Sequence, residues 1–155
     1  MTNDISQFLT AQNTILNLNT GCKRGALKEL SLYAAKQLDL DPDHLLQILL
    51  EREQLGTTGI GRGVAVPHAR VDVKELTGFL AKLSKPVDFD AIDDEPVDLV
   101  FLLLAPEQAD ADHLKALSRI ARLVSSDNVQ LAMRKAQDTQ HLYDVAIGKV
   151  DAQAA

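Results

Sequence analysis

The chain has 155 residues, of which 46% are hydrophobic and 25% charged, and its formal net charge is −6. This composition suffices for one domain with a single core, and the acidic balance argues against nucleic acid or an anionic membrane as the main partner, because both select for basic surface. The lone Cys22 cannot form an internal disulfide, and the first residues lack the basic start and apolar run of a secretory signal. The longest apolar run, Leu99 to Ala105, is too short to span a bilayer. We therefore predict a cytoplasmic protein with no nucleic-acid partner and no membrane-inserted segment.

Two helices are predicted in the first third of the chain. From Lys23 to Leu38 the apolar residues keep three-to-four spacing, which places them on one face of a helix. Asp41 followed by Pro42 predicts the start of a second helix, because aspartate is a favourable N-cap and proline suits the first helical position. This helix is expected to end near Glu53. A short helix at residues 4–9 and a first strand at residues 14–18 are also predicted.

The second half of the chain alternates strand and helix signals. Residues 77–83 are a candidate strand, and residues 97–104 form a nearly continuous apolar run of the kind buried on both faces of a sheet, closed by Pro106. Helical spacing follows from residue 109 to residue 124. Two further helices are predicted, one capped by Ser126 or Asp127 and reaching about Ala136, the other capped by Thr139 and ending at Gly148.

These elements predict an α/β (α+β) fold in which a mixed sheet of about five strands is flanked by helices. The whole chain, residues 1–155, is expected to form a single domain. Residues 151–155 have nothing to bury and are expected to fray.

A glycine-rich stretch follows the second predicted helix and cannot be explained by core-building. Four of the eight glycines fall within eight residues, which suggests positive φ angles or the close approach of another group to the main chain; they are Gly56, Gly59, Gly61 and Gly63. The spacing matches neither a P-loop, which needs Lys-Ser/Thr after the last glycine, nor a dinucleotide-binding fingerprint. A short apolar strand then leads into Pro67-His68. Because proline stiffens the backbone, we expect the strand to end with His68 held rigidly at its exit.

His68 is the first candidate for chemistry. A neutral imidazole offers one ring nitrogen as a nucleophile, provided that the other nitrogen keeps its proton and is oriented by an acceptor. The alternative is that His68 only caps a loop. His44 and His141 lie in predicted helices, where a surface or packing role is expected.

His113 and Arg52 are the other candidates. His113 falls in the first turn of the helix after the buried strand, where ligands gather in open α/β sheets and where the helix N-terminus favours an anion. From there it can donate a hydrogen bond to a phosphoryl oxygen on His68. Arg52 lies just before the glycine-rich stretch, so it is either a phosphate contact or part of a surface ion pair that contributes little.

Acidic residues are concentrated between Pro86 and Asp112, which contains nine acids and no lysine or arginine. This run is either a set of solvated loop ends or an acidic rim for a basic partner.

Three segments together resemble the active-site signature of the enzyme IIA family of the bacterial phosphotransferase system, mannitol/fructose type, and most closely its nitrogen-regulatory members. They are Arg52-Glu53, Thr58-Gly59-Ile60-Gly61, and Gly63-Val64-Ala65-Val66-Pro67-His68-Ala69-Arg70. The similarity continues from Pro86 to Pro106 and on to His113-Leu114. The resemblance implies a mixed sheet flanked by helices. It also implies that His68 is the phosphorylated histidine, His113 the second active-site histidine, and Arg52 an arginine that lines the site.

The resemblance leads to a hypothesis of function. The protein is a phosphocarrier of the nitrogen-related phosphotransferase system: His68 accepts a phosphoryl group from an HPr-like phosphohistidine protein, and the loop residues Thr58, Gly59, Gly61 and Gly63 bind the phosphate. Neither a metal nor a cofactor is required. Its phosphorylation state then regulates partner proteins, which in this family include potassium transport systems and sensor kinases.

The sequence also allows three alternative functions. The first is a sugar-specific IIA that passes the phosphoryl group to a membrane permease, and the second is an interaction module that binds phosphate without transferring it. The third, a two-histidine phosphoesterase, is disfavoured because such enzymes need Ser or Thr shortly after each histidine, whereas Ala-Arg follows His68 and Leu-Lys follows His113.

Overall fold

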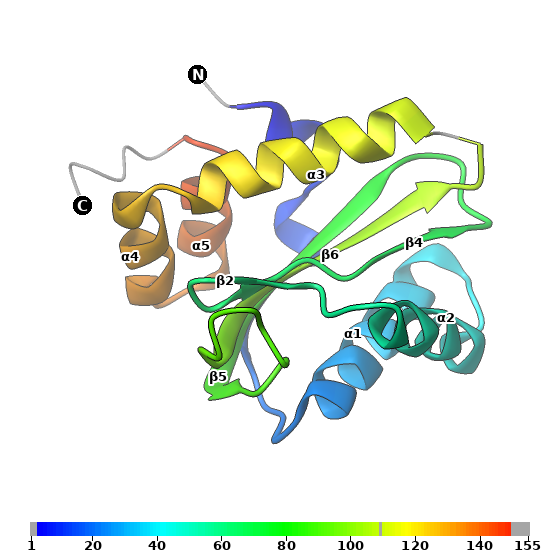
Figure 1. Cartoon of the computed structure of the whole chain (residues 1–155). Coiled ribbons are helices and arrows are strands. Elements are labelled where there is room, and N and C mark those ends of the chain that lie inside the picture. Colours follow the sequence, from blue (N-terminus) through cyan, green and yellow to red (C-terminus); the bar gives the residue numbers. More distant parts are fainter. Residues whose placement is uncertain (1–2, 109, 150–155) are drawn as a thin grey trace.

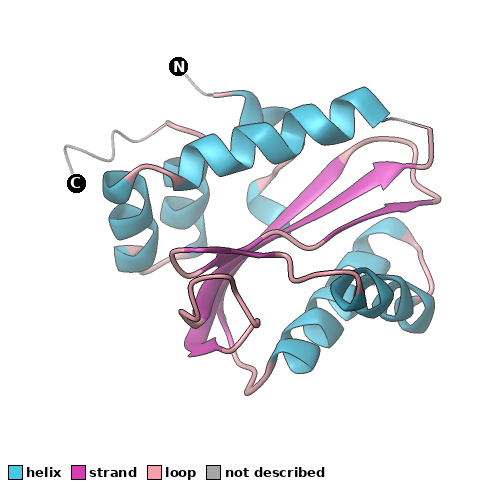
Figure 2. Ribbon diagram, in the orientation of Figure 1, coloured by secondary structure: helices cyan, strands magenta, loops and turns pink. Residues whose placement is uncertain are grey.

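Six strands form one mixed sheet in the part of the chain that the computed structural model describes, residues 3–108 and 110–149 (Figures 1 and 2). The strands are β1 (Thr14–Leu18), β2 (Gly59–Gly61), β3 (Val64–Ala65), β4 (His68–Val71), β5 (Thr77–Val87) and β6 (Val97–Pro106). They follow the order β1-β5-β6-β3-β2, and β4 pairs with β6 beyond β3. β1 is parallel to β5, and β3 and β4 are parallel to β6, whereas β5 and β6 are antiparallel. The predicted mixed sheet is confirmed.

Helices cover both faces of this sheet (Figure 1). On one side lie α1 (Lys23–Leu38) and α2 (Pro42–Gln54); on the other lie α3 (Asp110–Val124), α4 (Asp127–Lys135) and α5 (Thr139–Ala146), with the short 3-10 helices η1 (Asp4–Gln7) and η2 (Ala11–Asn13) in the N-terminal segment. Among the described residues, no helix combines the length and apolar character needed to cross a membrane.

The central strand β6 divides the core into two clusters. Leu99, Phe101 and Leu103 join the cluster beneath α3, α4 and α5, whereas the alternate residues Val100 and Leu102 join the cluster beneath α1 and α2. Because successive strand residues point to opposite faces, a strand buried on both faces is apolar throughout. This arrangement explains the continuous apolar run in the sequence.

The predicted helix starts are confirmed in most cases. α1 spans residues 23–38 as predicted, and α2 begins with Asp41 as N-cap and Pro42 as its first residue. Ser126 caps α4, because its hydroxyl accepts a hydrogen bond from Val129 N–H. The prediction for the last helix is wrong by one residue: Asp138, not Thr139, is the N-cap, since its carboxylate accepts from His141 N–H.

The segment around His68 differs from the prediction. β3 ends at Ala65, and His68 does not sit at its exit but begins a new strand, β4, because its backbone pairs with Leu103 of β6. The predicted short helix at residues 4–9 is a single 3-10 segment, Asp4–Gln7. The expected fraying of residues 151–155 concerns residues outside the described part of the chain.

Candidate active site

The structure brings His68 and His113 together from segments 45 residues apart in sequence. Their ring centroids lie 5.1 Å apart with an interplanar angle of 72°, an edge-on arrangement. His68 is the first residue of β4, and His113 lies near the start of α3, which follows β6. Because β4 runs parallel to β6, the chain leaving the end of β6 can return over β4 and place His113 against His68. His113 is buried, with 6% of its surface exposed.

A main-chain carbonyl orients the His68 ring. Nδ1 of His68 lies 2.8 Å from the carbonyl oxygen of Val66. Since a carbonyl oxygen can only accept, Nδ1 carries the proton, and in the neutral ring Nε2 holds the lone pair. The site thus meets the requirement for a nucleophilic imidazole, namely one protonated nitrogen held by an acceptor and one nitrogen left available.

The surroundings of His68 favour the neutral ring. Burial lowers the pKa of His68 below its ordinary value of 6.5, while its hydrogen bond to Val66 raises it. The nearby Arg52 charge lowers the pKa further, and the Glu53 carboxylate raises it. The net effect is a lowered pKa, so at neutral pH the ring is predominantly unprotonated.

Arg52 and Glu53 reach the site from the last turn of α2. Nη1 of Arg52 donates to the Gly56 carbonyl at 2.8 Å, which ties the end of the helix to the glycine-rich stretch. The Glu53 carboxylate accepts from Thr58 N–H with N–O distances of 3.1 and 3.2 Å. It also pairs with Lys23 at 2.8 Å, and its side chain is only 5% exposed. Sequence reasoning assigned no role to Glu53, although its place beside Arg52 in the signature was a signal.

The glycine-rich stretch forms a β-hairpin, made of β2, the turn Arg62-Gly63 and β3, which we call the glycine hairpin. Gly63 has a φ of 80°, and a Cβ added there would lie 2.4 Å from the Arg134 guanidinium, so both predicted reasons for glycine hold at this position. Thr58, just before the hairpin, accepts from Val66 N–H at 2.9 Å through its carbonyl. This bond therefore holds Val66, whose carbonyl orients the His68 ring, against the start of the hairpin.

Thr58 also presents a buried hydroxyl. Its residue exposure is 4%, and Oγ1 has no hydrogen-bond partner among the described residues. A buried hydroxyl without a partner is costly unless a ligand satisfies it. The expected contact between Thr58 and a phosphate stays a prediction.

Arg134, on α4, holds the hairpin turn and was missed by the sequence analysis. Its Nη2 donates to the Arg62 carbonyl at 2.8 Å, and its Nε donates to the two Asp98 carboxylate oxygens at 2.9 and 3.1 Å. On the other side of the turn, Asp93 accepts from Arg62 N–H at 2.8 Å, and this bond lowers the pKa of Asp93. No local pattern indicated these contacts, because they join segments 31 to 72 residues apart.

Within residues 3–108 and 110–149, no group of three or more His, Cys, Asp or Glu side chains is placed to hold a metal ion. His68 offers an oriented imidazole, with the Arg52 and Glu53 charges nearby.

Comparisons with known proteins identify the class of protein that this fold and site define. The family model described as "Phosphoenolpyruvate-dependent sugar phosphotransferase system, EIIA 2" matches residues 7–147. The chain belongs to this family, as its resemblance predicted.

Similar proteins in this family include several named as nitrogen regulatory proteins. A protein named "Nitrogen regulatory protein" from Bradyrhizobium diazoefficiens is 45% identical over 142 residues, which cover 91% of this chain and 93% of the relative. A protein of the same name from Escherichia coli is 37% identical over 143 residues, covering 91% and 88%. The crystal structure of nitrogen regulatory protein IIA-Ntr from Neisseria meningitidis superimposes with a TM-score of 0.86 at 33% identity, covering 92% of this chain and 98% of that one.

Proposed function

We propose that this protein is a phosphocarrier of a nitrogen-related phosphotransferase system and that Nε2 of His68 accepts the phosphoryl group. The observation that carries this proposal is the hydrogen bond between His68 Nδ1 and the Val66 carbonyl, which leaves Nε2 as the nucleophilic nitrogen. The lowered pKa of His68 keeps that lone pair available. The relatives named as nitrogen regulatory proteins support the nitrogen-related assignment.

The transfer step is a displacement between two imidazoles. The Nε2 lone pair of His68 attacks phosphorus in line with the donor's phosphorus–nitrogen bond; that bond breaks, and its electron pair returns to the donor ring. Such a step requires mainly alignment and stabilisation of charge on the phosphoryl oxygens. Arg52 and His113 supply that stabilisation.

Of the loop residues expected to bind the phosphate, Thr58 is hydrogen-bonded to Val66 beside His68 and is the proposed contact. Gly61 and Gly63 instead flank the hairpin turn that Asp93 and Arg134 hold, and Gly59 N–H already donates to the Thr57 hydroxyl.

The donor is an HPr-like phosphocarrier that docks around His68. Four large apolar side chains are exposed on the segments that carry or adjoin the site: Leu55 after α2, Ile60 on β2, Ile92 in the β5–β6 connection and Leu114 beside His113, with exposures of 85%, 47%, 88% and 66%. Acidic residues lie among them, including Asp93 at the hairpin turn and Asp112 next to His113. A donor with a basic and partly apolar face complements this surface.

Phosphorylation then acts as a signal. A phosphoryl group on His68 adds about two negative charges to the docking face, so partners distinguish the two forms by charge. The proposed regulatory targets are potassium transport systems or sensor kinases, and the proposed location is the cytoplasm.

Incubation with a phosphorylated HPr-type donor, followed by intact mass spectrometry, tests the proposal. The protein should gain one phosphoryl group that is labile in acid and stable in base, as expected for phosphohistidine. His68→Ala should gain none, whereas the control variants His44→Ala and His141→Ala, at exposed or half-buried helical positions, should be labelled like wild type. Labelling of His68→Ala would overturn the assignment. Rapid onward transfer to the IIB domain of a sugar permease would instead favour the sugar-specific alternative.

A further inference from the structure

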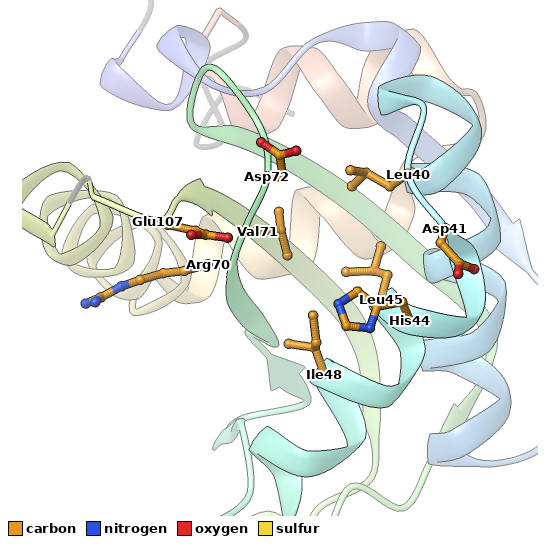
Figure 3. Close-up of a pocket in the computed structure, with 9 residues that line it drawn as sticks. All are labelled: Leu40, Asp41, His44, Leu45, Ile48, Arg70, Val71, Asp72 and Glu107. Carbon is orange, nitrogen blue, oxygen red and sulfur yellow. The ribbon is translucent and has the colours of Figure 1, made fainter.

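A small cavity of about 130 Å³ lies between α2 and the C-terminal end of β4 (Figure 3). Its lining comes from four segments of the chain: Leu40, Asp41, His44, Leu45, Ile48, Arg70, Val71, Asp72 and Glu107. Leu45 and Val71 are buried and form an apolar floor, with Leu40 and Ile48 half-buried beside them. A cavity of about 150 Å³ can hold one benzene molecule, so this one is large enough for a single side chain.

The rim of the cavity is acidic. Asp72 and Glu107 are exposed and contribute two carboxylates to the rim, against the single cation of Arg70, whereas the Asp41 carboxylate is held at the start of α2, where it accepts from Asp43 N–H. Figure 3 shows the Arg70 guanidinium turned away from the His44 ring, whereas the Glu107 carboxylate points toward Val71. The carboxylates of the rim repel an anion, and a purely apolar group has no electrostatic attraction to them. A cationic head on an apolar stem satisfies both the floor and the rim.

A more open groove adjoins the cavity at Asp72, which lines both. Its volume is about 600 Å³, and its lining is Gln37, Leu38, Asp39, Asp72, Val73, Lys74, Glu75 and Thr77. Asp39 and Glu75 add two carboxylates and Lys74 one cation, so the acidic character extends along the groove. A free amine fills only the cavity, whereas a polypeptide segment with one basic side chain in the cavity also occupies the groove.

We propose that this cavity and groove form a docking site for a basic segment of a protein partner, with one lysine or arginine side chain inserted between α2 and β4. The charge complementarity and the one-side-chain size of the cavity carry this assignment. It does not depend on phosphoryl transfer, because the site is complete in the unmodified protein.

The docking site shares its two supporting elements with the candidate active site. His68 and Val71 are three residues apart on β4, which corresponds to roughly 10 Å along a strand. Ile48 and Arg52 are four residues apart on α2 and therefore lie on the same face, one turn from each other. A partner anchored here is positioned beside His68, where it can sense a phosphoryl group.

Titration of the unphosphorylated, isotope-labelled protein by NMR tests the proposal. The probe is the peptide acetyl-Gly-Gly-Lys-Gly-Gly-amide, and the matched control replaces lysine with norleucine, which keeps the stem and removes the charge. The lysine peptide should shift the amides of Leu45, Ile48 and Val71 in the cavity and of Val73 in the groove, with a Kd on the order of millimolar for so small a ligand. The norleucine peptide should bind at least fivefold more weakly.

Charge variants provide the second arm. Asp72→Asn and Glu107→Gln should each weaken the lysine peptide severalfold, whereas Glu29→Gln, an exposed acid on α1 outside the cavity and groove, should not change its Kd. Equal binding of the lysine and norleucine peptides would show an apolar cavity without charge selection. Equal binding of n-butylamine and the peptide, with no shift at Val73, would show a small-amine site. Either result, or no shift at tens of millimolar peptide, overturns the proposal.

Discussion

The Arg134 guanidinium joins three segments, so its removal should loosen the glycine hairpin. Besides its bonds to Asp98 and to the Arg62 carbonyl, it donates through Nη1 to the Gln130 side chain at 2.7 Å. Asp98 N–H and Leu99 N–H in turn donate to the Gly63 carbonyl at 3.0 and 3.1 Å. Arg134→Met keeps most of the apolar stem and deletes these polar contacts, which makes it the appropriate perturbation.

The expected loss of stability is intermediate between that of a surface pair and that of a buried pair. The Arg134 and Asp98 side chains are 30% and 21% exposed, so water can partly replace the guanidinium. Exposed ion pairs contribute about 0–1 kcal/mol, and breaking a buried pair costs about 3–5 kcal/mol. We expect Arg134→Met to lower the free energy of unfolding by about 2–3 kcal/mol.

Urea unfolding and hydrogen exchange measure this effect. With a urea m-value of about 2 kcal/mol/M, the midpoint should fall by about 1–1.5 M. Exchange of the Asp98 and Leu99 amides should become faster, because the Gly63 carbonyl that accepts from them is less well held. Lys135→Met, the neighbouring exposed position on α4, removes the same charge and should change stability by no more than about 0.5 kcal/mol.

A double-mutant cycle with Asp98→Asn separates the ion pair from other effects. A coupling energy of about 1 kcal/mol or more is expected for two side chains in direct contact. If Arg134→Met destabilised the protein no more than Lys135→Met, or if the cycle gave no coupling, the argument that α4 holds the hairpin would be refuted.

Four further predictions concern the site itself. Arg52→Gln should raise the pKa of His68 and Glu53→Gln should lower it, because the two charges act on the imidazolium with opposite signs; NMR titration of the ring checks this, and shifts of the same sign would contradict it. The lowered pKa of His68 means that the unfolded state binds the proton more readily, so this residue's contribution to stability is present above pH 6.5 and is lost as pH falls through the folded pKa; the urea midpoint of wild type should therefore fall relative to that of His68→Gln as pH is lowered, and a constant difference would contradict this. Arg52→Ala should slow phosphoryl transfer in both directions by about 10²-fold, whereas His113→Ala should still accept the group but lose onward transfer; wild-type rates in stopped-flow assays would remove both from the site. The rate of phosphorylation should fall steeply with ionic strength, since the Debye length shrinks from about 10 Å at 0.1 M to about 3 Å at 1 M, and Asp112→Asn should flatten that slope; an unchanged slope would show that this acid is only solvated.

Local patterns in the sequence determined the helices and the long buried strand. The three-to-four spacing of apolar residues from Lys23 to Leu38 gave the bounds of α1, and the continuous apolar run gave β6, because each pattern reflects which faces of one element are buried. The glycines with Pro67-His68 singled out His68 as the candidate nucleophile in the same way, since their backbone requirements are local. The four clustered glycines were expected to have positive φ angles or a close neighbour, and Gly56, Gly61 and Gly63 have positive φ.

The tertiary structure decided which distant groups meet. β2 and β4 have three and four residues, too few to show a period, and they exist as strands because β3 and β6 supply their hydrogen-bond partners. The same holds for His113 beside His68, and for Arg134 beside the hairpin turn. A residue's sequence neighbours fix its backbone preference and the face it shows, but these contacts depend on the pairing register and on helix packing, which arise only when the whole sheet is assembled.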